Sequence, residues 1–177
     1  VHQLLKERDV LFLLMILPSS YIYQSDIEQK KIPGAVVLVA RKGRVVYLKA
    51  FGYKNLIPQK ESVTIDTIFD VASLTKVLAT ATSVMLLVEE GKLSLTDPVS
   101  AYLPDFAQNG KGSITVVQLL THYSGLRPDL DLDELWEGYE TGIKKAFGEQ
   151  LVSSPGEKFI YSDINYIVLA EIIRQVS

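Results

Sequence analysis

The longest periodic pattern of apolar residues follows Val71. After Ser73, apolar residues recur at spacings of three and four as far as Glu90, which predicts a helix that stops at Gly91. Because apolar residues lie on nearly every side of this helix, we expect it to be central and buried. A short β-like run, residues 67–70, precedes it, so Ser73 is expected in the first helical turn. Free backbone N–H groups favour negative charge there.

Two strands are predicted earlier in the chain. Residues 35–40 are continuously apolar, which is typical of a strand buried on both faces. Residues 41–44 form a turn and residues 45–51 a second strand, which makes a hairpin, and residues 52–63 are a polar loop. No later strand is predicted. The strand over 35–40 therefore has one partner and an unpaired edge, which invites pairing with another chain.

The remaining pattern predicts helices joined by turns. Pro18 stands in the first turn of one helix, Thr115 is the expected N-cap of a second, and Ser162 or Asp163 caps the last. The expected helices cover about residues 18–31, 116–120, 142–151 and 164–176, with a turn at 153–157 and an extended segment at 159–161.

Composition narrows the class of protein. The chain has 177 residues, of which 47% are apolar and 22% charged, as expected for a folded globular chain. The net charge of −3, without a long basic run, argues against nucleic-acid binding. The sequence has no cysteine, and its two histidines, His2 and His122, are not at metal-ligand spacing. We therefore expect no metal and no cofactor.

The first 17 residues form an apolar extension. A charged segment, Lys6-Glu7-Arg8, precedes an apolar run over residues 10–17, somewhat as in a signal peptide, and this run is too short to span a bilayer. Asp9 and the lack of an A-x-A cleavage site argue against a signal peptide. The alternatives are an export or anchor remnant and a packed helix. The expected domains are thus residues 1–17 and 18–177, and a periplasmic or secreted bacterial protein is somewhat favoured over a cytoplasmic one.

Ser73 and Lys76 are the first candidates for chemistry. Residues three apart on a helix lie on the same face, so the lysine amine can take the serine proton or stabilise the resulting charge. The S-x-x-K pattern is short, however, and an N-cap serine beside a solvated lysine gives the same four letters. Its interpretation depends on the rest of the chain.

Tyr161-Ser162-Asp163 is the second motif, and with it the chain resembles the serine β-lactamase and penicillin-binding-protein superfamily. The resemblance is to the branch of class C β-lactamases, DD-peptidases and β-lactamase-type carboxylesterases. Residues 73–76 are similar to that family's first motif, and residues 161–163 to its second, usually Y-x-N. Further segments similar to the family are residues 32–35, 51–52, 93–99, 120–126 and 155–156. The similarity runs in consistent order from about residue 27 to residue 177.

The resemblance implies a fold and a set of roles. The fold is α/β (α+β), β-lactamase/transpeptidase-like, here an N-terminal helix and hairpin with the mostly helical domain, without the C-terminal strands and helix. Ser73 would be acylated, Lys76 would lower the cost of deprotonating it, and Tyr161 would serve as general base or proton shuttle. His122 lies in a segment that the family uses as a structural loop.

Two departures from the family pattern bear on activity. Asp163 stands where β-lactamases have Asn, and it is the expected substrate-binding residue. A carboxylate cannot donate a hydrogen bond, favours a protonated Lys76 and repels an anionic β-lactam. The alternative is that Asp163 only caps the last helix. The K-T-G or H-x-G motif is absent from the 177 residues. That motif supplies an oxyanion-hole donor, and loss of one such donor costs roughly 100- to 1000-fold in rate.

The sequence therefore predicts a serine acyl hydrolase of esterase type that works through an acyl-Ser73 intermediate, with activity impaired by the absent motif. The alternative within this class is a β-lactamase or a DD-peptidase-type penicillin-binding protein. The alternative from another class is a catalytically silent fragment that acts in binding or assembly. The expected partners are a small ester or β-lactam-like substrate, and a second copy or complementing chain that covers the edge of the 35–40 strand.

Overall fold

The computed structural model describes residues 21–131 and 135–177. It divides into two compact units, with the boundary between Asp70 and Val71. The sequence did not predict this boundary. The domain boundary expected at residues 17 and 18, the apolar extension, and the start of the helix expected over 18–31 lie outside the described residues.

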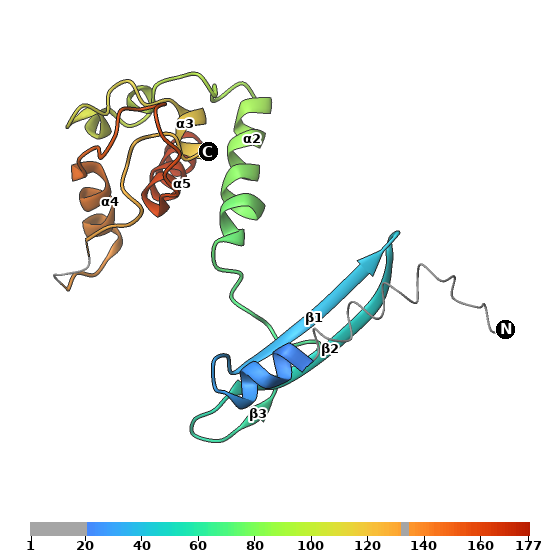
Figure 1. The fold of residues 1–177 in the computed structure, drawn as a ribbon. Helices are drawn as coiled ribbons and strands as arrows, with labels where there is room; N and C mark the ends of the chain where they lie inside the picture. Colours follow the sequence, from blue (N-terminus) through green and yellow to red (C-terminus); the bar gives the residue numbers. More distant parts are fainter. Residues whose placement is uncertain (1–20, 132–134) are drawn as a thin grey trace. The chain divides into compact units, whose positions relative to one another are not determined.

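Unit 1 contains a helix over residues 21–28 and a three-stranded antiparallel sheet in the order β1-β2-β3 (Figure 1). The strands are β1 (Gly34–Arg41), β2 (Arg44–Asn55) and β3 (Glu61–Ser62). The hairpin is confirmed: Leu38 pairs with Leu48, and a bulge lies between Val39 and Ala40. The loop expected over 52–63 is wrong in part, because β2 continues into it and β3 pairs with the end of β2.

Two strand predictions in unit 1 are wrong. Within unit 1 the 35–40 strand is not buried on both faces: Leu38 is 56% exposed, and partly covered and open positions alternate from there to the end of β1. Residues 67–70 form no strand, since no described strand pairs with them. Among the described strands β1 pairs with β2 alone, so its second edge is unpaired, as the sequence predicted.

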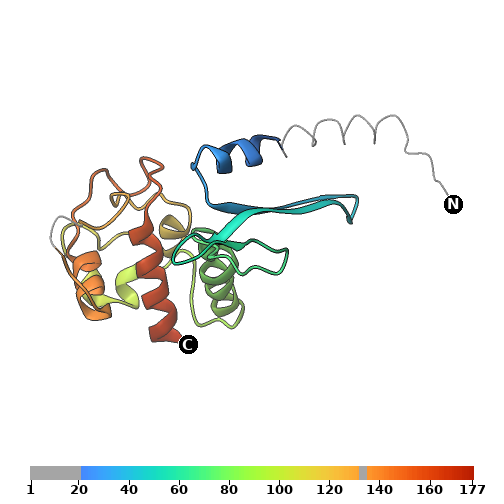
Figure 2. The same cartoon turned by 90° about the horizontal axis from the view of Figure 1, so that it is seen from below.

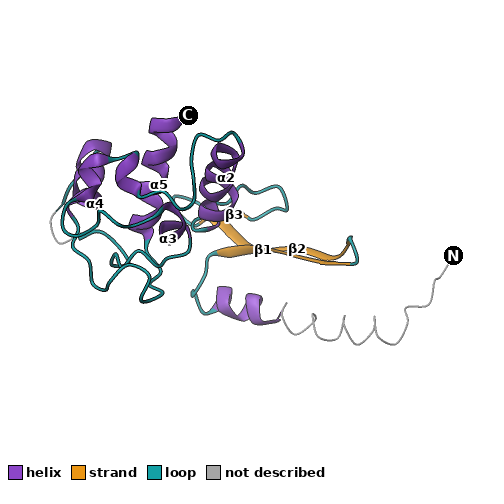
Figure 3. Cartoon of the chain, turned by 90° about the horizontal axis from the view of Figure 1, so that it is seen from above, coloured by secondary structure: helices purple, strands orange, loops and turns teal. Residues whose placement is uncertain are grey.

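Unit 2 is built from helices and loops (Figure 3). A continuous helical stretch starts at Leu74; its first part, η1 (Lys76–Ala81), is wound as a π-helix, and its second part is α2 (Thr82–Glu89). The elements that follow are η2 (Val99–Ala101), η3 (Pro104–Ala107), α3 (Val116–Leu120), α4 (Tyr139–Gly148) and α5 (Asp163–Val176). The helix expected over 142–151 therefore begins and ends three residues earlier.

Local sequence signals set the ends of these helices. Gly91 has a φ of +69°, and its N–H bonds to the Val88 carbonyl while the Lys92 N–H bonds to the Leu87 carbonyl. These two bonds form a Schellman motif, which confirms the predicted stop. Thr115 caps α3 in a capping box with Gln118, also as predicted.

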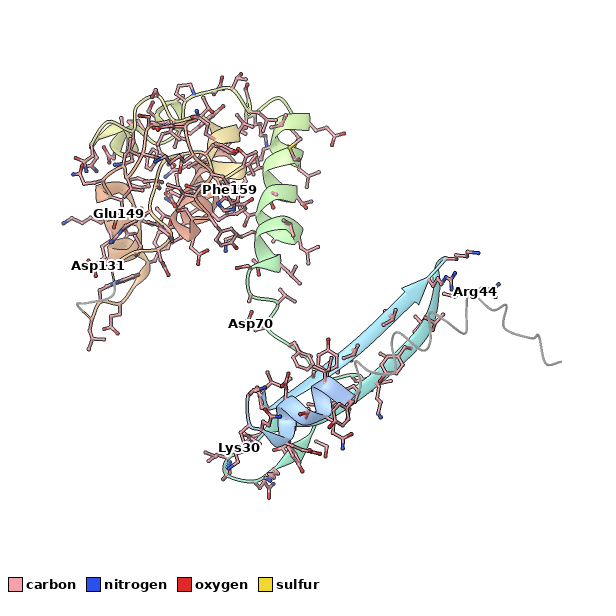
Figure 4. All side chains as sticks on the ribbon, viewed as in Figure 1. Lys30, Arg44, Asp70, Asp131, Glu149 and Phe159 are labelled. Carbon is pink, nitrogen blue, oxygen red and sulfur yellow. The ribbon has the colours of Figure 1, made fainter. Side chains whose placement is uncertain are left out.

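The core of unit 2 lies around α5, which packs against α2, α3 and α4 (Figure 2). Side chains fill the space between these helices (Figure 4). Four buried residues of α5 fall on one face, at the spacing of an amphipathic helix: Ile164, Val168, Leu169 and Ile172.

Within unit 2 the prediction of a central buried helix after Ser73 is not met. Only Val84 and Leu87 of α2 are buried, and η1 has no buried residue. The physical reason is that α5 covers one face of this stretch within unit 2, which leaves Val77, Leu78 and Leu86 more than half exposed. Across the described ranges, no helix has the length and apolarity to cross a bilayer.

Candidate active site

Ser73 lies in the turn that leads into the helical stretch, one residue before its start. It is exposed. The preceding residue, Ala72, has a φ of 44°, in the left-handed region that residues with a Cβ rarely adopt. Such strained backbone is common at functional sites, where the surrounding structure holds it. The turn therefore presents the Ser73 hydroxyl at the helix N-terminus, close to the predicted position.

Lys76 is the residue that joins the parts of the site. Its Nζ donates a hydrogen bond to Ser73 Oγ at 3.1 Å and lies 2.8 Å from Oδ1 of Asp163. The same ammonium lies over the ring of Tyr161, 5.2 Å from the ring centroid. The lysine side chain is 14% exposed and that of Asp163 is 46% exposed, so the ion pair is partly open to water.

Tyr161 comes to the same place from the segment before α5. Its hydroxyl forms hydrogen bonds with Ser73 and Lys76, which together lower the pKa of the phenol below its ordinary value. Its side chain is 46% exposed, so it is open to solvent. All four residues expected from the sequence to form the site, Ser73, Lys76, Tyr161 and Asp163, thus meet in unit 2.

The pKa shifts of the Lys76 amine and the Tyr161 phenol go in opposite directions. Burial of the Lys76 amine favours its neutral form, but its bonds to Asp163 and Tyr161 outweigh burial and raise its pKa. The amine is therefore an ammonium at neutral pH and cannot accept a proton. The bonds to Ser73 and Lys76 lower the pKa of the Tyr161 phenol, so its phenolate, which can accept a proton, forms more readily than that of a free tyrosine.

Asp163 is the first residue of α5, and Ser162 occupies the N-cap position. The Asp163 carboxylate pairs with Lys76, while its backbone N–H bonds to the Pro128 carbonyl at 2.7 Å. The Ser162 hydroxyl donates to the Arg127 carbonyl and makes no cap bond. Asp163 therefore contacts the charged amine of the site in addition to opening the helix.

His122 makes contacts that the sequence pattern does not predict. It is 8% exposed, and its Nδ1 accepts the Ser162 N–H at 3.1 Å. Its ring lies 4.5 Å from the ring of Tyr161, centroid to centroid. The segment T-H-Y-S-G-L stands out in the sequence, but no spacing rule links residue 122 to residue 162.

A cavity of about 750 Å³ in unit 2 lies elsewhere, between η3, α4 and α5. None of the four site residues lines it. Within the described residues, no group of three or more histidine and acidic side chains is placed to hold a metal ion. The groups that meet at the site are a serine hydroxyl, a phenol, an ammonium and a carboxylate.

Comparison with known proteins decides the family. The family model described as Beta-lactamase matches residues 21–177. The chain belongs to the beta-lactamase family. The fold expected from the sequence, mixed helix and antiparallel sheet of β-lactamase/transpeptidase type, is confirmed by structural neighbours of the same family.

Three relatives illustrate this beta-lactamase family membership. Protein flp of Staphylococcus aureus (strain N315) is 32% identical over 163 residues, which cover 88% of this chain and 32% of the relative. The octameric penicillin-binding protein homologue of Pyrococcus abyssi has a TM-score of 0.75 and 34% identity, over 89% of this chain and 38% of that one. EstCE1, a hydrolase with promiscuous acyltransferase activity, has a TM-score of 0.68 and 29% identity, over 88% and 46%.

The chain thus spans about a third of the length of that curated relative and less than half of these solved structures.

Proposed function

We propose that this chain carries the reactive half of a serine acyl hydrolase that acts on small esters through an acyl-Ser73 intermediate. The observation that carries the proposal is the geometry around Lys76, whose Nζ lies 3.1 Å from Ser73 Oγ while the Tyr161 hydroxyl bonds to both groups. A nucleophile, a proton acceptor and a fixed positive charge within hydrogen-bond reach are what covalent acyl transfer requires.

The reaction follows from the charges of these groups. Ser73 Oγ attacks the ester carbonyl carbon, and its proton passes to the Tyr161 phenolate, which the Lys76 ammonium stabilises. The tetrahedral intermediate collapses, and the alcohol leaves with the proton from Tyr161. Water, deprotonated by Tyr161, then attacks the acyl-Ser73 carbonyl. When this second tetrahedral intermediate collapses, the bond to Ser73 Oγ breaks, Tyr161 returns the proton to Oγ, and the acid is released.

Asp163 favours neutral substrates. Its carboxylate contacts Lys76, which in turn contacts Ser73. At this position it repels the carboxylate that β-lactams carry. The similarity to EstCE1, a hydrolase with acyltransferase activity, supports an ester substrate. The similarity to class C β-lactamases supports the second candidate, β-lactamase or DD-peptidase activity.

We expect slow turnover by the 177 residues alone. They hold no K-T-G or H-x-G segment, so they lack the oxyanion donor that this segment supplies. One missing donor lowers the rate by about 100- to 1000-fold. Acylation of Ser73 is therefore a more sensitive measurement than ester turnover.

A different class of function, assembly without catalysis, is favoured by one observation. Among the described strands β1 has only β2 as partner, and an open edge can accept a strand from another chain. The solved penicillin-binding protein homologue of this family is octameric, which supports this candidate. Light scattering that gives a monomer at micromolar concentration would count against it.

The test of the hydrolase proposal is covalent labelling. We expect a fluorophosphonate to add one phosphonyl group to the 177-residue chain, and peptide mass spectrometry to locate it on Ser73. Ser73→Ala should abolish labelling, whereas Ser177→Ala, at an exposed serine outside the site, should leave it unchanged. Labelling that survives Ser73→Ala would show that the nucleophile is misassigned.

A further inference from the structure

His122 holds the chain on both sides of Tyr161. Its carbonyl accepts the Ile160 N–H at 2.9 Å, and its Nδ1 accepts the Ser162 N–H at 3.1 Å. Its ring lies between those of Tyr161 and Tyr166, with centroids 4.5 and 5.3 Å away. One buried histidine therefore bonds to the backbone immediately before and after the phenol and packs on its ring.

We propose that His122 is a positioning residue that, as a neutral imidazole, holds Tyr161 against Ser73 and Lys76, and that its protonation releases Tyr161. The inference deepens the proposed function, because Tyr161 is the proton acceptor there. The placement of the phenol can nevertheless be measured without any reaction.

The hydrogen-bond network requires Nδ1 to be without a proton. The Ser162 backbone N–H can only donate, and it points at Nδ1. The Asn165 Nδ2 lies 3.4 Å from the same atom. The orientation of this amide is set by the Ser124 hydroxyl, which accepts the Leu126 N–H and donates its own proton to Asn165 Oδ1 at 2.6 Å. Two donors thus face one lone pair, and a proton on Nδ1 would meet both.

The surrounding charges favour the neutral ring. Burial and the nearby Lys76 ammonium lower the pKa of His122 below its ordinary value, and the Asp163 carboxylate opposes this only in part. The other titratable groups that face the ring are the phenols of Tyr161 and Tyr166. Protonation of the His122 ring places a second cation near Lys76 and converts Nδ1 from a hydrogen-bond acceptor into a donor. The bond to Ser162 is then lost, and with it the hold on Tyr161.

The backbone at position 122 suggests a matched pair of variants. His122 has a φ of 61°, a conformation that Asn tolerates better than most residues. In His122→Asn the side-chain oxygen takes the place of Nδ1, so the variant keeps the acceptor and cannot titrate. His122→Phe keeps the aromatic ring beside Tyr161 and loses the acceptor.

The experiment follows the phenols by NMR in the 177-residue chain labelled with ¹³Cζ-tyrosine, with Tyr161→Phe to assign the signal. In the wild type we expect the Tyr161 signal to shift as His122 protonates, below about pH 6.5. In His122→Asn this acid-side shift should disappear, while the Tyr161 phenol pKa stays within about half a unit of wild type. In His122→Phe that pKa should rise towards the ordinary value of about 10.

Three results would overturn the inference. They are a wild-type Tyr161 signal that does not respond to acid, an acid-side shift that persists in His122→Asn, and a folded His122→Phe variant with the wild-type Tyr161 pKa. If circular dichroism shows that His122→Phe is unfolded, the wild type and His122→Asn decide the matter. A chain that gives the expected NMR result but cannot be labelled at Ser73 would refute the proposed hydrolase function and leave the role of His122 intact.

Discussion

The Lys76 ammonium lies 2.8 Å from the Asp163 carboxylate, and the two residues form an ion pair between η1 and the first turn of α5. This pair keeps the lysine charged at neutral pH, because the carboxylate contact helps to raise the lysine pKa in spite of burial. The bonds from Ser73 and from this ammonium lower the pKa of the Tyr161 phenol, while the Asp163 charge itself acts in the opposite direction. The residue at position 163 therefore influences the ionisation of both the amine and the phenol.

Asp163→Asn should shift the site towards β-lactams. The variant removes a negative charge that repels the β-lactam carboxylate, and it offers an amide that can donate a hydrogen bond to the substrate. We expect the ratio of penicillin acylation to neutral-ester acylation to rise by about tenfold, which corresponds to ~1.4 kcal/mol. Time-resolved mass spectrometry of the acylated chain measures both rates. Asp105→Asn, at an exposed aspartate of η3, is the control. An unchanged ratio in Asp163→Asn would contradict the esterase preference.

Glu171 should make the stability of unit 2 dependent on pH in acid. Its carboxylate accepts a bidentate bond from Arg174 and one bond each from Tyr139 and Gln175. These bonds, that of Arg174 foremost, lower the pKa of Glu171 from 4.5 to about 2. Because the folded-state pKa is the lower one, the stabilisation is complete above pH 4.5 and is lost as pH falls towards 2.

Unfolding by urea at a series of pH values between 2 and 4.5 tests the stabilisation by the Glu171 carboxylate. In the wild type the free energy of unfolding should fall through that range, and in Glu171→Gln the fall should be smaller. Glu140→Gln, at an exposed glutamate in the first turn of α4, should behave as the wild type does. Identical pH profiles for the wild type and Glu171→Gln would show that the Arg174 contact adds no stability.

Gly125→Ala should destabilise the loop that carries His122. Gly125 has a φ of +80°, and a Cβ there would lie 2.2 Å from the Ser153 carbonyl oxygen. The neighbour is backbone and cannot rotate away, so we expect a loss of about 3 kcal/mol, measured as a lower urea midpoint. Gly148→Ala is the matched control, because a Cβ at Gly148 meets nothing within 4 Å. Equal midpoints for the two variants would contradict the steric argument.

The sequence predicted those features that depend on neighbouring residues. The capping box at Thr115, the stop at Gly91 and the hairpin after Gly34 follow from residues within a few positions of one another. Ser73 and Lys76 are three apart on a helix, so their contact was also predictable. Tyr161 and Asp163 lie almost 90 positions later, and only the family resemblance associated them with Ser73.

Features that depend on distant packing were missed. Residues 35–40 and the stretch after Ser73 are apolar enough to be buried, but burial is decided by what packs on them, and apolarity alone does not show that. The role of His122 was missed for the same reason, since its bond to the Ser162 N–H crosses 40 positions. The π-helical winding of η1 also has no signal in the spacing of apolar residues.

The π-helical winding of η1 changes which side chains share a face of the helix. A π-turn holds one residue more than an α-turn, and here the Thr82 hydroxyl bonds back to the Val77 carbonyl, five positions earlier. The extra residue lies between Lys76 and the core residues Val84 and Leu87, so it rotates one end of the helix relative to the other. Lys76 therefore lies on a different side of the helix, relative to Val84 and Leu87, than it would in a regular α-helix.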